Sequence, residues 1–340
     1  MSSPLAWREG SPDMMRSITR RAFLASTGGA ALALALPRAA RADSPPLNFG
    51  FQNTSWGSVA MVAEAEKTFE KAGAKVKPFR FDGGKSTRDA MIAGRVDIGV
   101  LGAAPFVVGA AKGDIVAIAV AMYAGRTNAV VAAKDSGIRS VADLKGRRVA
   151  SQLGSSTDYV FQNKILPKFG LAKGDVQIAN IPHQNEIAAM VGKSVDAFAG
   201  VEPFPSVAEI EGLGTVLVDY GEFDLQPVFV AINRPVLESR RGDVVAFLRG
   251  WLAAVRIVNE NPKRAVEIVW NEFKAQGYDV KEAAFTRMLA KLDVKPEFTP
   301  ALRDYLNEQG RVLLGQKQIP AVPDWNRALD ESVLVEAKKA

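Results

Sequence analysis

One pattern occurs twice in the chain and constrains its fold more than any other feature. Residues 93–106 read AGRVDIGVLGAAPF, and residues 191–204 read VGKSVDAFAGVEPF. Each copy has a glycine expected to end a helix, then Val-Asp, an apolar run, and Pro-Phe. Farther upstream, Gly73 and Gly170 each follow an amphipathic segment, as glycines at the C-terminal ends of helices do. The repeat therefore indicates two related halves.

Each half alternates strands with helices. The stretches NFGFQNTSWG (48–57) and VASQLGSSTD (149–158) both read as a strand that ends in a small polar loop and opens a helix. This alternation predicts an α/β fold with two lobes, each a mainly parallel sheet flanked by helices. We expect two crossovers, within residues 123–133 and 219–233. Lobe 1 would then comprise residues 43–127 and 228–340, and lobe 2 residues 128–227.

The loops that follow the strands are the candidate ligand site, because ligands of such sheets bind outside the carboxyl ends of the strands. Small residues let backbone amides approach a ligand, hydroxyls add donors, and helix N-termini favour anions. Each loop taken alone also reads as an ordinary helix N-cap. The candidates from both halves are Gln52, Thr54, Gly83, Gly84, Ala103, Ser155, Ser156, Asn185 and Glu202.

The segment FDGGKST (81–87) combines glycine, lysine and hydroxyl residues, as phosphate-binding loops do. A Walker loop requires a further glycine five positions before Gly84, where this chain has Phe79. The segment is therefore interpreted as one side of an anion site rather than a nucleotide loop. Lys85 and Arg126 are candidate cations for that anion, and each also reads as an exposed surface residue.

The N-terminus reads as an export signal. Residues 19–42 are TRRAFLASTGGAALALALPRAARA, which resembles a twin-arginine signal with cleavage near Ala42. Its apolar run of roughly fifteen residues is shorter than the roughly twenty that span a bilayer. We therefore expect residues 1–42 to be removed and the mature protein to be periplasmic.

Composition excludes several classes of function. The chain has no cysteine and one histidine, His183, which rules out thiolate and His-rich metal sites. His183 is interpreted as an ordinary loop residue rather than a catalytic one. Residues 1–42 hold six of the 43 basic and two of the 37 acidic residues, so their removal lowers the formal charge from +6 to +2. The sequence has no basic stripe interleaved with aromatic residues, the pattern that would indicate nucleic-acid binding.

After residue 234 the pattern is helical. The segment RGDVVAFLRGWLAAVRIVNENP (241–262) predicts a helix capped by Asp243, followed by a second helix that begins at Asn261-Pro262. Arg249 and Arg256 occupy the face opposite the apolar one. The apolar face is expected to pack in the core and comprises Val244, Phe247, Leu248, Trp251, Leu252 and Val255.

The order of these motifs resembles the periplasmic substrate-binding proteins of ABC importers for sulfonates, taurine and nitrate, which also include binders of thiamine-precursor pyrimidines. The similar stretches include LNFGFQ, AMIAGRVDIGVLGAAP, SVADLKGRRVASQLGSS and VDAFAGVEPF, over about residues 47–205. The resemblance implies a type II, Venus-flytrap fold with a ligand pocket between the lobes. Where relatives often have an aromatic and an acidic residue before Pro, this chain has Gly200, Val201 and Glu202.

The resemblance implies a monomeric receptor that is not an enzyme, needs no cofactor or metal, and delivers its ligand to an ABC permease. The expected ligand is a small organic anion or zwitterion such as an aliphatic sulfonate or taurine, whose amine Glu202 could accept. Nitrate, an aromatic acid and a thiamine-precursor pyrimidine are the alternatives. Two rivals are less favoured. Pyrimidine synthases of similar fold use a cysteine-rich stretch, and a transcription-factor effector domain would need an N-terminal helix-turn-helix.

Overall fold

The structure is a computed structural model that describes residues 44–339, so the predicted signal peptide at 1–42 lies outside the described residues. One compact unit begins at Pro45 and includes both sheets.

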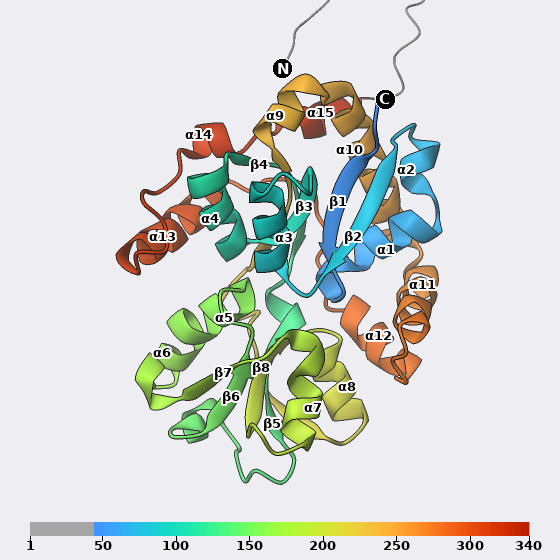
Figure 1. Ribbon diagram of the computed structural model, residues 1–340. Helices are drawn as coiled ribbons and strands as arrows, with labels where there is room; N and C mark the ends of the chain where they lie inside the picture. Colours follow the sequence, from blue (N-terminus) through green and yellow to red (C-terminus); the bar gives the residue numbers. More distant parts are fainter. Residues whose placement is uncertain (1–43, 340) are drawn as a thin grey trace, which may run out of the picture. The chain divides into compact units, whose positions relative to one another are not determined.

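The first sheet has five strands in the order β2–β1–β3–β10–β4 (Figure 1). Strand β10 is antiparallel to its two neighbours, β3 and β4, and the other strands run parallel to one another. The bounds are β1 Leu47–Gln52, β2 Val76–Phe81, β3 Ile98–Gly102, β4 Ile115–Tyr123 and β10 Pro227–Asn233.

The second sheet repeats this arrangement with the order β7–β6–β8–β5–β9. Here β5 is the antiparallel strand, between β8 and β9. The bounds are β5 Asn128–Ala133, β6 Arg148–Ser151, β7 Gln177–Asn180, β8 Ala197–Val201 and β9 Gly214–Asp219. Four strands of each sheet are parallel, which confirms the predicted α/β class with mainly parallel sheets.

The chain passes between the sheets twice. Residues 124–127 join β4 to β5, and residues 220–226 join β9 to β10. Each crossover feeds the strand that lies antiparallel in its new sheet. This strand membership supports the predicted lobes, whose boundaries remain a proposal.

Helices flank both sheets. Those between strands of the first sheet are α1 Ser58–Ala65, α2 Thr68–Lys71, α3 Gly84–Ile92 and α4 Ala103–Gly113. Those between strands of the second sheet are α5 Ser156–Val160, α6 Leu166–Lys168, α7 Glu186–Val191 and α8 Phe204–Ile210, with a π-helical turn at Phe161–Ile165. The predicted helical C-terminal region is confirmed and comprises α9 Arg234–Ser239, α10 Arg241–Glu260, α11 Pro262–Ala275, α12 Glu282–Leu289, α13 Leu302–Gly315, α14 Trp325–Ala328 and α15 Ser332–Lys338.

Helix α10 confirms its predicted apolar face and corrects its predicted cap. All six predicted core residues are buried. Asp243, however, lies in the first turn, where its carboxylate pairs with Arg240, the residue at the N-cap position. An acidic side chain in this turn is also favourable, because the N-terminus of a helix carries partial positive charge. Helix α11 begins at Pro262, as predicted, and Asn261 caps it by accepting from the backbone N–H of Arg264.

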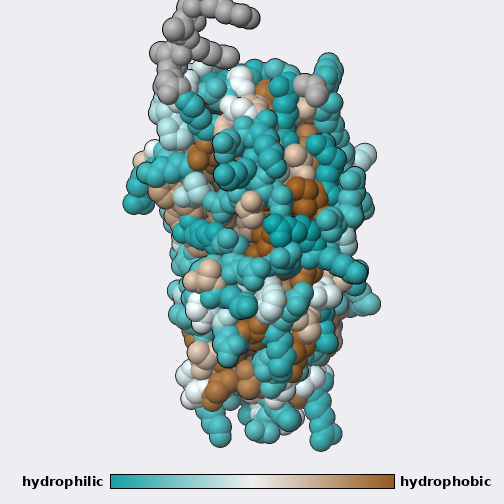
Figure 2. All heavy atoms as spheres, turned by 90° about the vertical axis from the view of Figure 1, so that its right-hand side faces the viewer, coloured by the Kyte–Doolittle hydropathy of each residue, from teal (hydrophilic) through white to brown (hydrophobic). Residues whose placement is uncertain are grey.

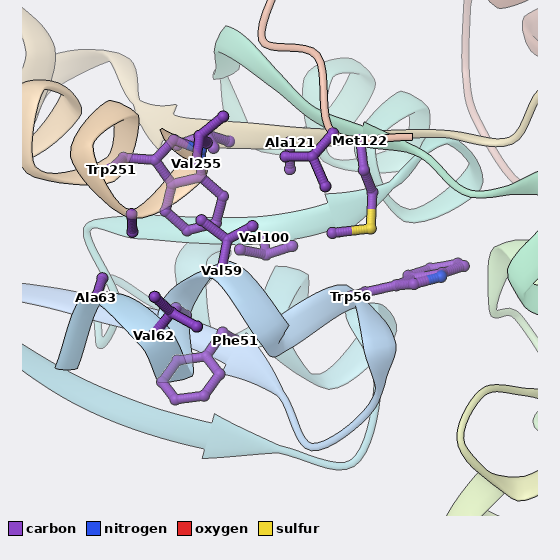
Figure 3. Close-up of a cluster of buried hydrophobic side chains, with 14 of the residues drawn as sticks. Phe51, Trp56, Val59, Val62, Ala63, Val100, Ala121, Met122, Trp251 and Val255 are labelled. Atoms are coloured by element: carbon purple, nitrogen blue, oxygen red, sulfur yellow. The ribbon is translucent and has the colours of Figure 1, made fainter. Parts of the chain in front are cut away.

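The core of the first sheet lies between its strands and helices α1 and α10 (Figure 3). Aromatic rings fill its centre: the Phe49 ring lies 5.0 Å from that of Phe247 and 6.1 Å from that of Trp251. In Figure 3 the Trp56 indole lies at the edge of this cluster, away from the Phe51 and Trp251 rings.

The repeated glycines behave similarly but not identically in the two halves. Gly73 and Gly170 have φ values of 78° and 76°, the left-handed conformation expected where a helix ends. In the repeated motif itself, Gly94 also has a positive φ of 69°. In the second copy Lys193 takes this role, with φ 58°, because Gly192 lies one position farther from Val-Asp than Gly94 does in the first copy.

Hydrophilic side chains cover most of the face on which α2 and α11 lie, and hydrophobic ones gather there only in small patches (Figure 2). Within residues 44–339, no helix combines the length and hydropathy that a membrane span requires. The same part of the chain contains no group of three or more His, Cys, Asp or Glu side chains placed to hold a metal ion.

Candidate functional site

Loops from the two sheets meet at the carboxyl ends of their strands. Ser156, at the start of α5, accepts a hydrogen bond of 3.0 Å from the backbone N–H of Ala104 at the start of α4. A Cβ atom on Gly102 would lie 2.5 Å from Ser156 Oγ and 2.6 Å from Trp56 Cζ3. The two sheets therefore approach here only because residue 102 is a glycine.

A second contact joins the β2 loop to the β6 loop. A Cβ atom on Gly83 would lie 2.6 Å from Gln152 Nε2, and one on Gly154 would lie 3.3 Å from Lys85 Cδ. Gly83 has extended backbone and precedes α3, whose N-terminus has no side-chain cap. The first-turn N–H groups of α3 therefore have no intrahelical partner, and the Gln152 amide lies beside Gly83, the residue before them.

The β1 loop contacts both the β8 loop and the first crossover. The backbone N–H of Ser55 donates to the carbonyl of Glu202 at 2.8 Å, and Trp56 Nε1 donates to Thr127 Oγ1 at 3.1 Å. We call residues 52–56, 82–85, 102–104, 152–156 and Glu202 the loop cluster. It combines segments that are far apart in the sequence and come from both sheets.

Several buried polar atoms in the loop cluster lack a hydrogen-bond partner. They are Gln52 Oε1, Ser55 Oγ and Gln152 Oε1, on side chains that are 1%, 0% and 7% exposed. Gln52 is held in place because its Nε2 donates to Thr87 Oγ1 and to the Val100 carbonyl, both at 2.8 Å. Leaving such atoms unpaired costs about 1–3 kcal/mol each, so their concentration at one place points to a ligand or ordered water.

Three hydroxyl candidates are engaged in capping helices. Thr54 accepts from the backbone N–H of Trp56 at 3.3 Å, and Ser155 accepts from that of Asp158 at 3.0 Å. Ser156 caps α4 across the boundary between the sheets. Gly83, Gly84 and Ala103 lie beside these residues at the starts of α3 and α4.

Glu202 is buried, but its carboxylate already has partners. The backbone N–H and the hydroxyl of Ser206 donate to it at 3.1 and 2.8 Å, and Lys291 forms an ion pair with it. The charge is thus neutralised from within the protein, which removes the reason for expecting Glu202 to receive a ligand amine.

The remaining candidates are exposed. The Lys85 side chain runs beside Gly154 at the edge of the loop cluster. Arg126 lies against Gly221 between the crossovers, and Asn185 precedes α7. Within the described part of the chain, neither Arg126 nor Asn185 forms an ion pair or hydrogen bond with another candidate.

His183 is buried and lies in the turn before α7. Its Nδ1 is 2.8 Å from Glu186 Oε1, and the two side chains are 5% and 0% exposed. Burial raises the pKa of Glu186 to about 7, although the nearby His183 lowers it. The pair lies in α7 and the turn before it, outside the loop cluster.

Sequence reasoning did not single out Gln152 or Asp158. Asp158 orders the loop before α5, because its carboxylate accepts from Ser151 Oγ at 3.1 Å, Gly154 N–H at 3.1 Å and Gln162 Nε2 at 2.7 Å. A signal for Gln152 was present in the repeat: it directly follows β6, while Gln52 ends β1 at the corresponding place in the first copy.

Comparison with known proteins identifies relatives of this chain. The chain is 32% identical over 221 residues to a provisionally named aliphatic sulfonates-binding protein of Escherichia coli (strain K12), covering 63% of this chain and 67% of the relative. It is also 32% identical over 210 residues to the taurine-binding periplasmic protein of the same organism, covering 60% and 64%. The chain thus spans about two thirds of the length of these relatives.

Among solved structures, the alkanesulfonate-binding protein of Xanthomonas axonopodis pv. citri bound to MOPS superposes with a TM-score of 0.74 at 22% identity, covering 85% of this chain and 99% of that one. This likeness confirms the predicted two-lobed periplasmic binding protein fold. The relatives are named as binding proteins, which confirms the predicted resemblance and the prediction of a binding protein rather than an enzyme. A family model matches residues 40–270, and the protein belongs to the NMT1-like family.

Proposed function

We propose that the protein is the solute-binding receptor of an ABC importer and captures an aliphatic sulfonate at the loop cluster. The observation that carries this proposal is the buried, unpaired Ser55 hydroxyl in the same loop cluster as the uncapped N-terminus of α3, since both can donate to an anion. A helix N-terminus favours an anion, and hydroxyl and backbone N–H groups donate to its oxygens.

The surroundings favour a sulfonate with a carbon chain over a small inorganic anion. The three oxygens of a sulfonate can accept from the Ser55 hydroxyl and from first-turn amides of α3, while the Trp56 indole beside Gly102 offers an apolar surface for the chain. The Glu202 carboxylate is held by Lys291 and Ser206. The unpaired acceptors open to a ligand amine in the loop cluster are therefore Gln52 Oε1 and Gln152 Oε1. We therefore propose an aliphatic sulfonate, taurine included, with nitrate, aromatic acids and aminopyrimidines as alternatives.

Capture would proceed by closure of the two lobes at the crossovers. The ligand drives closure only to the extent that it makes better contacts in the closed state. Ser156 already forms such an inter-sheet contact, because its hydroxyl accepts from the backbone N–H of Ala104. The closed protein would then deliver the ligand to a membrane permease as a monomer, after export through the twin-arginine route and cleavage near Ala42. The periplasmic location of the taurine-binding relative supports the proposed export.

Thermal unfolding against a ligand panel tests the proposal. A ligand at one hundred times its dissociation constant stabilises the folded state by about 2.7 kcal/mol. We expect stabilisation by alkanesulfonates and taurine, and less by nitrate, aromatic acids and aminopyrimidines. Stabilisation by a sugar or a cation, with none by any anion, would contradict an anion receptor.

The affinity of the variant Gln152→Ala tests whether the ligand binds at the loop cluster. It removes the second-sheet amide that lies over Gly83, and we expect alkanesulfonate affinity to fall about tenfold, equivalent to about 1.4 kcal/mol. Gln177→Ala, which removes an exposed glutamine on β7, is the matched control and should leave affinity unchanged. Equal affinities in the two variants would exclude Gln152 from the site.

A further inference from the structure

A second candidate site lies among the helices α2, α10 and α15, which pack on the first sheet. Helices α2, α10 and α15 pack side by side there (Figure 1) and enclose a surface pocket of about 350 Å³. Its lining contains four cations, Lys71, Arg249, Arg256 and Lys338, and no carboxylate among the described residues. This pocket shares no residue with the loop cluster.

The spacing along α10 explains how the pocket is built. Arg249, Leu252, Ala253 and Arg256 follow one another at intervals of three, one and three residues, so they share one face of the helix. The arginines flank an apolar floor formed by Leu252 and Ala253. Helices α2 and α15 each add a small apolar residue and a lysine, namely Ala72 with Lys71 and Ala337 with Lys338.

Most of the positive charge in the pocket is uncompensated. Lys338 pairs with Glu297, but Lys71, Arg249 and Arg256 form no ion pair within residues 44–339. Like charges gathered at one place repel one another, and an anion placed among them relieves that repulsion. The arrangement is therefore one that a bound anion stabilises.

Two buried polar atoms at the pocket have no partner. Thr68 is 4% exposed, and its Oγ1 makes no hydrogen bond. Arg249 Nε is likewise buried and unpaired. Both residues line the pocket, and both groups can donate to an oxyanion. Unpaired buried groups of this kind in a native protein point to a missing ligand, ion or water.

We propose that this pocket binds a small amphiphilic oxyanion, whose charged head pairs with Arg249 and Arg256 and whose apolar part covers Leu252 and Ala253. The volume supports an organic ligand, because 350 Å³ is more than ten times the roughly 30 Å³ that one water molecule occupies in the liquid. Arginine suits the head because its planar guanidinium binds phosphate and carboxylate through two parallel hydrogen bonds.

Calorimetric titration with octyl phosphate, below the concentration at which it forms micelles, tests this proposal. We expect binding to the wild type to weaken at least about tenfold in Arg249→Gln/Arg256→Gln, because each arginine supplies a charge-assisted hydrogen bond. The matched control Arg147→Gln/Arg311→Gln removes two exposed arginines elsewhere and should bind as the wild type does. So should Gln152→Ala, which separates this pocket from the loop cluster. Unchanged affinity in Arg249→Gln/Arg256→Gln would overturn the proposal.

Another variant and two further ligands separate this proposal from its alternatives. Thr68→Val replaces the hydroxyl with a methyl group and should weaken octyl phosphate binding about threefold while the far-ultraviolet circular dichroism spectrum stays unchanged. Inorganic phosphate should bind more weakly than octyl phosphate, and equal binding would contradict an apolar contact. A contrary outcome is that the double variant loses binding to anionic phospholipid vesicles and still binds octyl phosphate as the wild type does. In that outcome the arginines contact a membrane surface, and the small-ligand proposal fails.

Discussion

At the scale of single residues, the His183–Glu186 pair has a consequence for stability. Burial raises the pKa of Glu186 to about 7 from its ordinary value of 4.5, even with His183 beside it. The folded state therefore binds a proton more tightly than the unfolded state does. The stability that this proton contributes is complete below about pH 4.5 and is lost as pH rises to about 7.

We therefore predict that the free energy of unfolding falls between about pH 5 and 7, by at most about 1.4 kcal/mol per pH unit from this group. Glu186→Gln should remove that part of the slope, because an amide does not titrate. Urea unfolding at several pH values measures it. Glu260→Gln, at an exposed position, is the control and should keep the wild-type slope. The same slope in Glu186→Gln and wild type would assign the titration to other groups.

Residue types alone predicted part of the loop cluster. Ser155 and Thr54 were expected at helix starts because hydroxyls cap helices, and they do so here. Gln152 was not singled out, because its meaning depends on Gly83, which reaches it only through the fold. Glu202 was expected to be available to a ligand, but Lys291 lies in a C-terminal segment whose proximity no local pattern reveals.

At the scale of elements, the repeat predicted the sheets because the order of strands and helices is local information. It could not show that the two loop sets touch, since this depends on one missing Cβ at Gly102. The backbone of Gly102 has φ −66° and ψ 164°, which alanine also adopts. Any effect of an added methyl at this position therefore comes from its contacts with Ser156 and Trp56, not from backbone strain.

Gly102→Ala should accordingly weaken alkanesulfonate binding by about tenfold or more, because the methyl separates the loops that close on the ligand. Calorimetric titration measures the affinity, and urea unfolding separates a closure defect from a folding defect. Gly315→Ala, at a helical glycine with no neighbour near the added atom, should leave affinity unchanged. Wild-type affinity in Gly102→Ala would show that the ligand does not require this contact.

At the scale of the whole molecule, the buried carboxylate of Asp224 contacts helical residues from two distant parts of the chain. Asp224, in the second crossover, pairs with Lys164 of the π-helical turn at 2.8 Å and accepts from Tyr305 of α13 at 2.7 Å. Its backbone carbonyl also lies against Gly125 of the first crossover, where a side chain would not fit. Two segments that are distant in the sequence are thereby fixed beside each other.

Removing one partner of this pair should cost more than the pair contributes. Lys164→Met leaves the fully buried Asp224 carboxylate without its cation, and breaking a buried pair in this way costs about 3–5 kcal/mol. Because Lys164 is 23% exposed, we expect at most about 3 kcal/mol. Lys164→Met/Asp224→Asn removes both charges and should recover part of the loss. Lys295→Met breaks an exposed pair and should leave stability nearly unchanged. Urea midpoints at an unchanged slope measure these differences. If the double variant is less stable than Lys164→Met, the unpaired charge is not the cause of the loss.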